Sequence, residues 1–385
     1  RWSVRPDNAS EVSRILALAS EIRVPLRPPG DEPCEGPVIE LELSGLSEIH
    51  SVDEEARMVH AGAGLKVRDL EATLRDHGCT LGFPLVPHLG PKLGGFLSTE
   101  GWAESSVEYG RPGDSALGIE GILPTGRKCC VKPAPRRAGG PDIAQLFLGS
   151  EGALGILTDA WVRFHAIPKA RKVMAASFPD MRSASRCAAR VVHEGARTGF
   201  GRILDAPGEG PGRGGPPILV LGFEGEPRLV EVFHGMAAKL TREAGGTGLP
   251  EDHPQAGRQV RTPCADVERA DHLTASAPWS AALAVMRAAG GILGGSAMAV
   301  RVSDLLHEGC SITWTCMIDR SGMSSESAPS VLVDAAGRVR ECGGTVTAWL
   351  GPFRARPPGV LLRDPGFDEL LARLRGILDP GDVLG

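Results

Sequence analysis

A glycine-rich loop inside Gly139–Phe164 constrains the fold of this chain more than any other feature. Gly149–Gly155 holds three glycines in seven residues. Glycine N–H groups can donate to a ligand that lies against the backbone, because no Cβ stands in the way. An early proline and apolar residues at helical spacing predict a helix over Pro141–Phe147, and alternation predicts a strand over Ile156–Phe164. The loop is therefore either a ligand-binding turn or punctuation between a helix and a strand.

The size and charge of the chain limit the classes of protein to which it can belong. A length of 385 residues, 42% of them hydrophobic, predicts two globular domains. The formal charge of −5 comes from interspersed acids and bases, so no nucleic-acid partner is predicted. No apolar run approaches the roughly 20 residues of a membrane-spanning helix, and we expect no secretory signal.

Cysteine usage points to a reducing compartment. The nine cysteines show neither a zinc spacing nor a disulfide framework, which predicts reduced thiols, a cytoplasmic location and no metal site. The high content of glycine, alanine, arginine and proline favours a bacterial source.

Helix and strand patterns alternate along the first 165 residues, which favours an α+β or α/β domain. Apolar residues at helical spacing predict amphipathic helices over 9–22 and 67–77. A domain boundary is expected near Pro168. Beyond it, strands are predicted over 173–178, 218–223 and 311–318, and helices over 183–194, 230–243 and 281–289.

Several short motifs follow one another along the chain: Arg5-Pro6 with Glu11-Val12, Leu93-Gly94-Gly95 with Ser98-Thr99, Tyr109-Gly110, Gly140-Pro141-Asp142 through Gly155, Ser276-Ala277-Pro278-Trp279, and Leu378-Asp379-Pro380-Gly381. Each motif alone is weak, but the ordered set spans nearly the whole chain. It resembles the flavoproteins of the vanillyl-alcohol oxidase type. The resemblance is strongest to the branch with alkyldihydroxyacetonephosphate synthase and the FAD-linked D-lactate and glycolate dehydrogenases.

The resemblance implies an α+β fold, with a bipartite FAD-binding domain of the vanillyl-alcohol oxidase and p-cresol methylhydroxylase type and a cap domain of antiparallel sheet. The FAD-binding domain is expected over residues 1–165, and the cap, which holds the substrate, over 166–345. Residues 346–385 are expected to return to the FAD-binding domain.

The resemblance also implies bound FAD. No histidine or cysteine stands where the family attaches flavin covalently, so noncovalent FAD is expected. The residues that it places along the cofactor are Pro87, His88, Lys92, Ser98, Thr99, Glu151, Gly152, Gly155 and Ile156.

The segment that matches the family's diphosphate loop departs from the pattern. Arg27–Pro33 holds three prolines, which lack an N–H, and two acids that repel phosphate. The departure leaves weak, different or absent FAD binding open, and Lys92 is either a replacement anion contact or a solvated loop lysine.

The catalytic positions of the family have changed more. Ala348-Trp349-Leu350 stands where the synthase has a histidine run, and Thr313, with Thr315 on the same face, stands where it has an acid/base tyrosine. A threonine hydroxyl is a poor acid or base near neutral pH. Arg202 matches an active-site arginine that can stabilise a reduced flavin or hold a carboxylate. Arg261 matches a substrate phosphate ligand.

These residues support three functions in descending order. The first is an FAD-dependent oxidoreductase acting on a small or medium organic substrate, with Arg202 and Thr313 in the catalytic site. The second is a non-catalytic relative or partner subunit, which the lost histidines favour. The third is an alkylglycerone-phosphate synthase-like enzyme. The resemblance also leaves a homodimer open.

Overall fold

The chain divides into two compact units in the computed structural model. The first takes the described residues within Arg1–Ala103, Tyr109–Ile167 and Asp364–Gly385, and the second those within Glu104–Glu108 and Pro168–Arg363. The structure describes residues 1–28, 36–83, 91–99, 106–134, 140–205, 215–250, 270–294, 297–316, 330–350 and 365–384.

The first unit is built on a five-stranded antiparallel sheet of order β4-β5-β9-β7-β8. Its core packs the sheet against α2 and α3, whose leucines join Val59 and Ile119. The expected strand over 156–164 is confirmed as β9, at the centre of this sheet. The elements are β4 (Ile49–Asp53), β5 (Met58–Gly62), β9 (Ile156–Arg163), β7 (Ala116–Ile122), β8 (Lys128–Val131), α2 (Val67–Asp76) and α3 (Leu93–Ser98).

A small parallel sheet, β1-β3-β2, lies in the same unit with α1 (Ala9–Ile22). The side chain of Asn8 caps α1 by accepting a hydrogen bond from the Glu11 N–H at 3.0 Å, and Arg23 ends it in the left-handed conformation. The predicted helix over 9–22 is therefore confirmed. The remaining elements are β1 (Trp2–Val4), β2 (Leu26–Arg27), β3 (Ile39–Leu41), η1 (Leu43–Gly45), β6 (Cys79–Thr80), α4 (Ser106–Tyr109), α5 (Pro112–Ser115), η2 (Ile143–Leu146) and β10 (His165–Ala166).

The chain returns to this unit through α10 (Pro365–Leu378) and the Asp379 turn that follows it. The Asp379 carboxylate accepts hydrogen bonds from the backbone N–H groups of Val383 at 3.0 Å and Leu384 at 2.8 Å. Val383 is fully buried beside α1, and its carbonyl accepts a hydrogen bond from the Leu26 N–H at 2.7 Å. The closing motif thus anchors the end of the chain to the small parallel sheet.

Replacing Asp379 by alanine is expected to lower the free energy of unfolding by about 2–3 kcal/mol, because two N–H groups lose a charged acceptor. Chemical denaturation measures the loss. Asp382→Asn is the matched control, since the Asp382 side chain is 85% exposed and asparagine tolerates its positive φ of 50°. Equal stability of the two variants would contradict the anchoring role.

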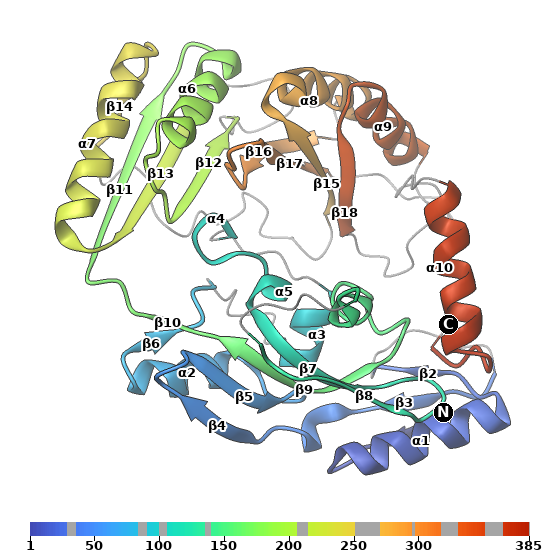
Figure 1. Cartoon of the computed structure of the whole chain (residues 1–385). Coiled ribbons are helices and arrows are strands. Elements are labelled where there is room, and N and C mark those ends of the chain that lie inside the picture. The colour runs from blue at the N-terminus through green and yellow to red at the C-terminus, as the bar shows by residue number, and fades with distance from the viewer. Residues whose placement is uncertain are drawn as a thin grey trace. The chain divides into compact units, whose positions relative to one another are not determined.

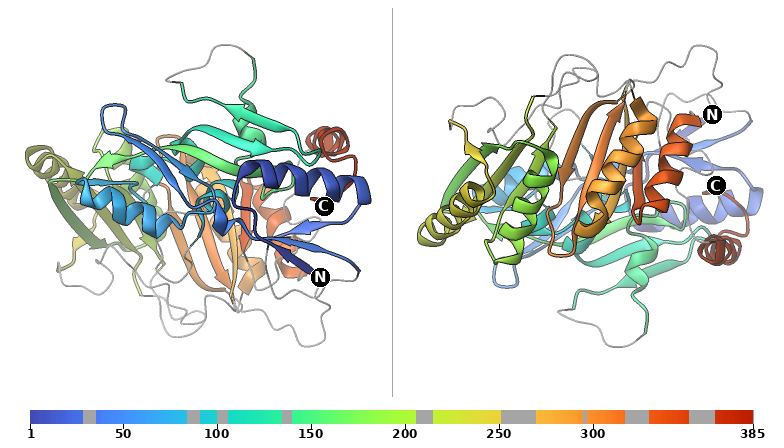
Figure 2. Two further views of the ribbon diagram at one scale, coloured as in Figure 1. Left: turned by 90° about the horizontal axis from the view of Figure 1, so that it is seen from below. Right: turned by 90° about the horizontal axis from the view of Figure 1, so that it is seen from above.

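The second unit is one eight-stranded antiparallel sheet of order β14-β11-β13-β12-β16-β17-β15-β18. Four helices, α6 to α9, cover one face of it, as the view from above shows (Figure 2), and bury the main core there. The expected antiparallel cap sheet is confirmed. The strands are β11 (Ala170–Ser177), β12 (Phe200–Leu204), β13 (Ile218–Gly225), β14 (Thr247–Gly248), β15 (Asp271–Pro278), β16 (Ala297–Ser303), β17 (Gly309–Cys316) and β18 (Thr345–Leu350). The helices are α6 (Met181–His193), α7 (Pro227–Glu243), α8 (Trp279–Leu293) and α9 (Ser330–Glu341).

The structure corrects two expectations. β18 pairs with β15, so residues 346–350 complete the second unit's sheet, and the returning segment does not begin at residue 346 (Figure 1). Gly343 and Gly344 connect α9 to this strand, so the chain does not leave the second unit at this point. The helix expected over Pro141–Phe147 is only the short 3-10 helix η2, which the Asp142 side chain caps and Phe147 ends.

Candidate functional site

The loop Gly149–Gly155 lies against the end of α3 in the first unit. The Glu151 N–H donates to the Ser98 carbonyl at 2.8 Å, and the Gly149 N–H donates to the Leu97 carbonyl at 3.3 Å. The Thr99 hydroxyl donates to the carbonyl of Gly95 at 2.7 Å. The structure therefore brings together the two segments, around Ser98-Thr99 and Glu151–Ile156, that the sequence placed along one cofactor.

Phe147 fixes this loop to the sheet. Its ring is 1% exposed and fills a notch formed by Gly121 and Gly155. A Cβ added at either glycine would lie 2.6 Å and 2.5 Å, respectively, from the Phe147 ring. Close packing against Phe147 thus requires a glycine at 155, whereas Gly95 and Gly152 leave open space beside the backbone.

Lys92 precedes α3 and forms an ion pair with Glu42. Partial burial acts to raise the pKa of Glu42, but hydrogen bonds from Lys92 and Ser44 outweigh it, so that this pKa is lowered. Glu42 is therefore ionised at neutral pH, and an incoming phosphate must share the Lys92 ammonium with this carboxylate.

The face of the second sheet away from the helices carries a polar set of side chains. In a strand, alternate residues point to opposite faces, and directly paired residues share a face. Ile203, Val302 and Ile312 belong to the helix-covered core, so their neighbours along each strand point to the other face. These neighbours are Arg202, Arg301, Ser303, Ser311, Thr313, Thr315, Ser276, Thr274 and His272.

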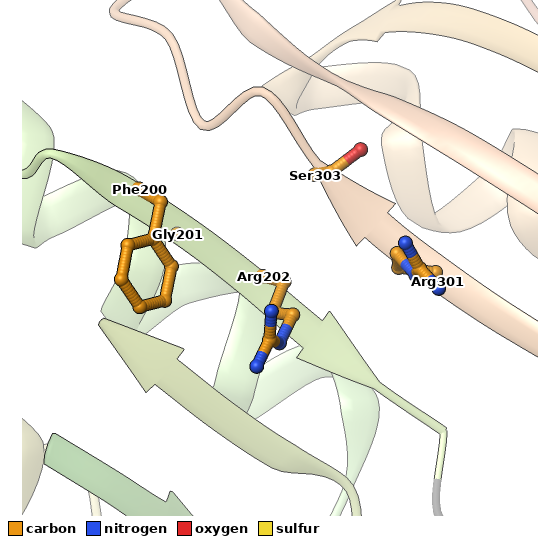
Figure 3. Close-up of a pocket in the computed structure, with 5 residues that line it drawn as sticks. All are labelled: Phe200, Gly201, Arg202, Arg301 and Ser303. Carbon is orange, nitrogen blue, oxygen red and sulfur yellow. The ribbon is translucent and has the colours of Figure 1, made fainter. Parts of the chain in front are cut away.

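Arg202 lies at one end of this polar set. Its side chain is 2% exposed, and its guanidinium carbon lies 5.5 Å from the centre of the Phe200 ring. Both side chains project from the same side of β12, next to Arg301 and Ser303 on β16 (Figure 3). These residues bring two cationic side chains together around a gap that is too small for a water molecule. Such a pair favours a carboxylate or another anion.

Thr313 and Thr315 lie on the same face, as expected. The Thr313 and Thr274 hydroxyls are 3.0 Å apart, and the Thr315 hydroxyl lies 3.1 Å from Nδ1 of His272. His272 pairs directly with Leu350 across β15 and β18. Leu350 is one of the three residues at the positions where the synthase has histidines. His272 therefore places a histidine on the strand next to those positions.

A family model matches part of the first unit. Residues 2–129 match the model of the FAD binding domain. The chain carries an FAD binding domain. Curated relatives match about half of the chain: an uncharacterized FAD-linked oxidoreductase, YgcU, of Escherichia coli (strain K12) is 30% identical, covering 52% of this chain and 43% of the relative. The mitochondrial D-lactate dehydrogenase [cytochrome] 1 of Saccharomyces cerevisiae is 30% identical, covering 52% and 36%. The D-lactate dehydrogenase of Archaeoglobus fulgidus is 31% identical, covering 50% and 44%.

Solved structures match the chain over almost its full length. A structure of alkyldihydroxyacetonephosphate synthase superposes with a TM-score of 0.76 at 19% identity, covering 99% of this chain and 76% of that one. p-Cresol methylhydroxylase with substrate bound gives 0.75 at 14% identity, covering 99% and 87%. The expected fold type is thus confirmed. By contrast, the chain spans less than half of the length of the three curated relatives above.

The described part of the FAD binding domain fits its cofactor. Open space beside Gly95 and Gly152 lets a ligand approach the backbone, and the Ser98 and Thr99 hydroxyls both donate to the Gly95 carbonyl at the end of α3. Pro87, His88 and the expected diphosphate loop at 29–33 lie outside the described residues, as does Arg261 of the second unit. No helix in the described ranges has the length and apolarity needed to cross a bilayer.

Sequence reasoning missed His272 and Arg301. His272, Thr274 and Ser276 alternate with buried Leu273 and Ala275, which is a signal for a half-buried strand. The alternation was available from the sequence. The partners were not, because His272 and Thr315 are 43 residues apart and meet only through the sheet order.

Proposed function

We propose that the chain is an FAD-dependent oxidoreductase acting on a small or medium organic substrate that bears a carboxylate, with 2-hydroxy acids as the first class to test. The FAD binding domain supports the cofactor, and two D-lactate dehydrogenases among its relatives support the substrate class. The observation that carries the proposal is the arginine pair Arg202 and Arg301 on a polar sheet face that also holds a histidine.

In this proposal the FAD binding domain holds the cofactor at Lys92, Ser98-Thr99 and the Gly149–Gly155 loop, without a covalent bond. FAD supplies the two-electron acceptor that takes the hydrogen of the substrate carbon. Arg301 and Arg202 hold the substrate carboxylate, and Nε2 of His272 accepts the hydroxyl proton.

The two arginines lie at different distances from His272 in the sheet. Arg301 lies two strands from His272 and two residues out of register with it, whereas Arg202 lies three strands away and four residues out of register, which corresponds to about 12 Å and about 20 Å between backbone positions. Arg301 is therefore the better placed to share one small substrate with His272. Thr313 pairs with Arg301 and positions it rather than acting as an acid or base.

The other two functions remain alternatives. A non-catalytic relative is favoured by the absence of a histidine at 348–350, and His272 weakens that argument. A synthase-like enzyme needs an acid/base group in the place of Thr313. A homodimer and a cytoplasmic location stay predictions.

Anaerobic titration of the FAD-loaded chain tests the proposed function. The flavin absorbance is expected to fall on addition of D-lactate, glycolate or a longer 2-hydroxy acid. Propionate, which keeps the carboxylate but lacks the hydroxyl, serves as the control and should leave the spectrum unreduced. Retention of the oxidised spectrum with every hydroxy acid would refute this substrate class.

A further inference from the structure

Two histidines and an aspartate meet on the five-stranded sheet of the first unit. His50 on β4, His60 on β5 and Asp159 on β9 place their ligand atoms within 4.8 Å of one another. Nε2 of His50 is 2.7 Å from Oδ1 of Asp159, and Nε2 of His60 is 4.0 Å from the same oxygen. Val59 and Ala61 beside His60 point into the core, so the cluster lies on the opposite face from α2 and α3.

Neighbouring side chains hold the cluster in place. The His60 ring stacks on Trp161 with centroids 4.0 Å apart and an interplanar angle of 9°. Nε2 of His60 is buried and has no hydrogen-bond partner among the described residues. A carboxylate oxygen of Glu48 lies 3.9 Å from Nδ1 of His50. At that distance the exposed Glu48 makes no hydrogen bond to His50, so the Trp161 stack is the contact that orients the cluster.

We propose that His50, His60 and Asp159 bind a divalent transition-metal ion such as Zn²⁺, through both Nε2 atoms and Oδ1. Imidazole and carboxylate are the ligand types that Zn²⁺ accepts, with bonds of about 2.0–2.2 Å. Tetrahedral coordination at those lengths separates ligand atoms by about 3.4 Å. The two observed separations to Oδ1, 2.7 Å and 4.0 Å, lie on either side of that value, and all ligand atoms lie within 4.8 Å of one another, so side-chain adjustments bring them to a metal ion. Water completes the coordination.

The site is separate from the proposed cofactor loop and was not visible in the sequence. Asp159 is far from the two histidines along the chain, 109 positions after His50. Only the order β4-β5-β9 places them side by side. Cysteine spacing, on which the prediction of no metal site depended, carries no information about such a cluster.

Isothermal titration of the full-length chain with Zn²⁺ tests the proposal. One equivalent is expected to bind, and His60→Gln and Asp159→Asn should each weaken binding at least tenfold, since even outer-shell changes cost about 10–100-fold in metal affinity. His77→Gln is the matched control, because His77 has a carboxylate partner, Glu54 at 3.0 Å, without a second histidine. It should bind Zn²⁺ as the unchanged chain does.

Cys130 on β8 offers the main competing ligand, so Cys130→Ser is titrated in parallel and should retain the affinity. Circular dichroism verifies that each variant is folded, and Asp159→Asn preserves the shape of the side chain. Absence of Zn²⁺ binding in the unchanged chain would overturn the proposal. Unchanged affinity in both ligand variants, or its loss in Cys130→Ser alone, would do the same.

Discussion

Replacing Arg202 by methionine is expected to lower kcat/KM for the oxidised substrate by about 100-fold or more, the cost of removing one preorganised charged donor from a site. Arg202 is nearly fully buried on the face of the second sheet away from the helices, and it stacks on Phe200. Methionine keeps most of the apolar stem but removes the guanidinium. Because an arginine that holds a substrate anion acts in binding and in orientation, KM should rise and kcat should fall.

Steady-state kinetics of FAD-loaded variants measure this effect. Arg171→Met is the control, because Arg171 lies on β11, is 43% exposed and pairs with Glu224 at 3.5 Å, away from the arginine pair. Arg202→Lys keeps the charge but not the bidentate fork, so it should recover only part of the activity. The lysine variant also tests the role of Arg202 if the methionine variant does not fold. Kinetic constants equal to those of Arg171→Met would show that Arg202 is structural.

Replacing Gly155 by alanine is expected to destabilise the first unit by about 2–3 kcal/mol, within the range of overpacked cores. The new Cβ would lie 2.5 Å from the Phe147 ring and 2.9 Å from the Ile122 carbonyl oxygen. The ring is fully enclosed, so the loop must move instead. Because this loop belongs to the proposed cofactor site, FAD affinity should fall together with stability.

A double-mutant cycle isolates the cause of this effect. Phe147→Leu removes the ring edge that meets the new Cβ, so Gly155→Ala should cost less in the leucine background than alone. Gly376→Ala on α10 is the control, because nothing lies within 4 Å of a Cβ added there and its φ is not positive. Strictly additive losses in urea denaturation would contradict the notch described for Phe147.

The local sequence pattern was enough to predict the elements that residues close together in the chain determine. The helix over 9–22 follows from its apolar spacing and from the Asn8 cap, and β9 follows from alternation. The helix over 141–147 shortened to a 3-10 helix over 143–146, because apolar spacing over so few residues does not separate the two kinds of helix.

The sites depend on pairing between strands, which the local sequence pattern does not predict. The sequence placed Thr313 and Thr315 on one face correctly, because alternation within one strand determines it. It did not place His272 beside Thr315, nor His50 beside Asp159, because strand order and register bring those residues together. Resemblance supplied the fold, and the structure was needed to locate the charges.

Binding of FAD tests the central claim most directly. The purified chain is incubated with excess FAD, freed of unbound cofactor by gel filtration, and examined by its absorption spectrum and by the flavin released on denaturation. We expect one FAD per chain, all of it released into solution by denaturation, in agreement with a noncovalent site on the FAD binding domain. A colourless chain that retains no flavin after incubation with excess FAD would contradict the account.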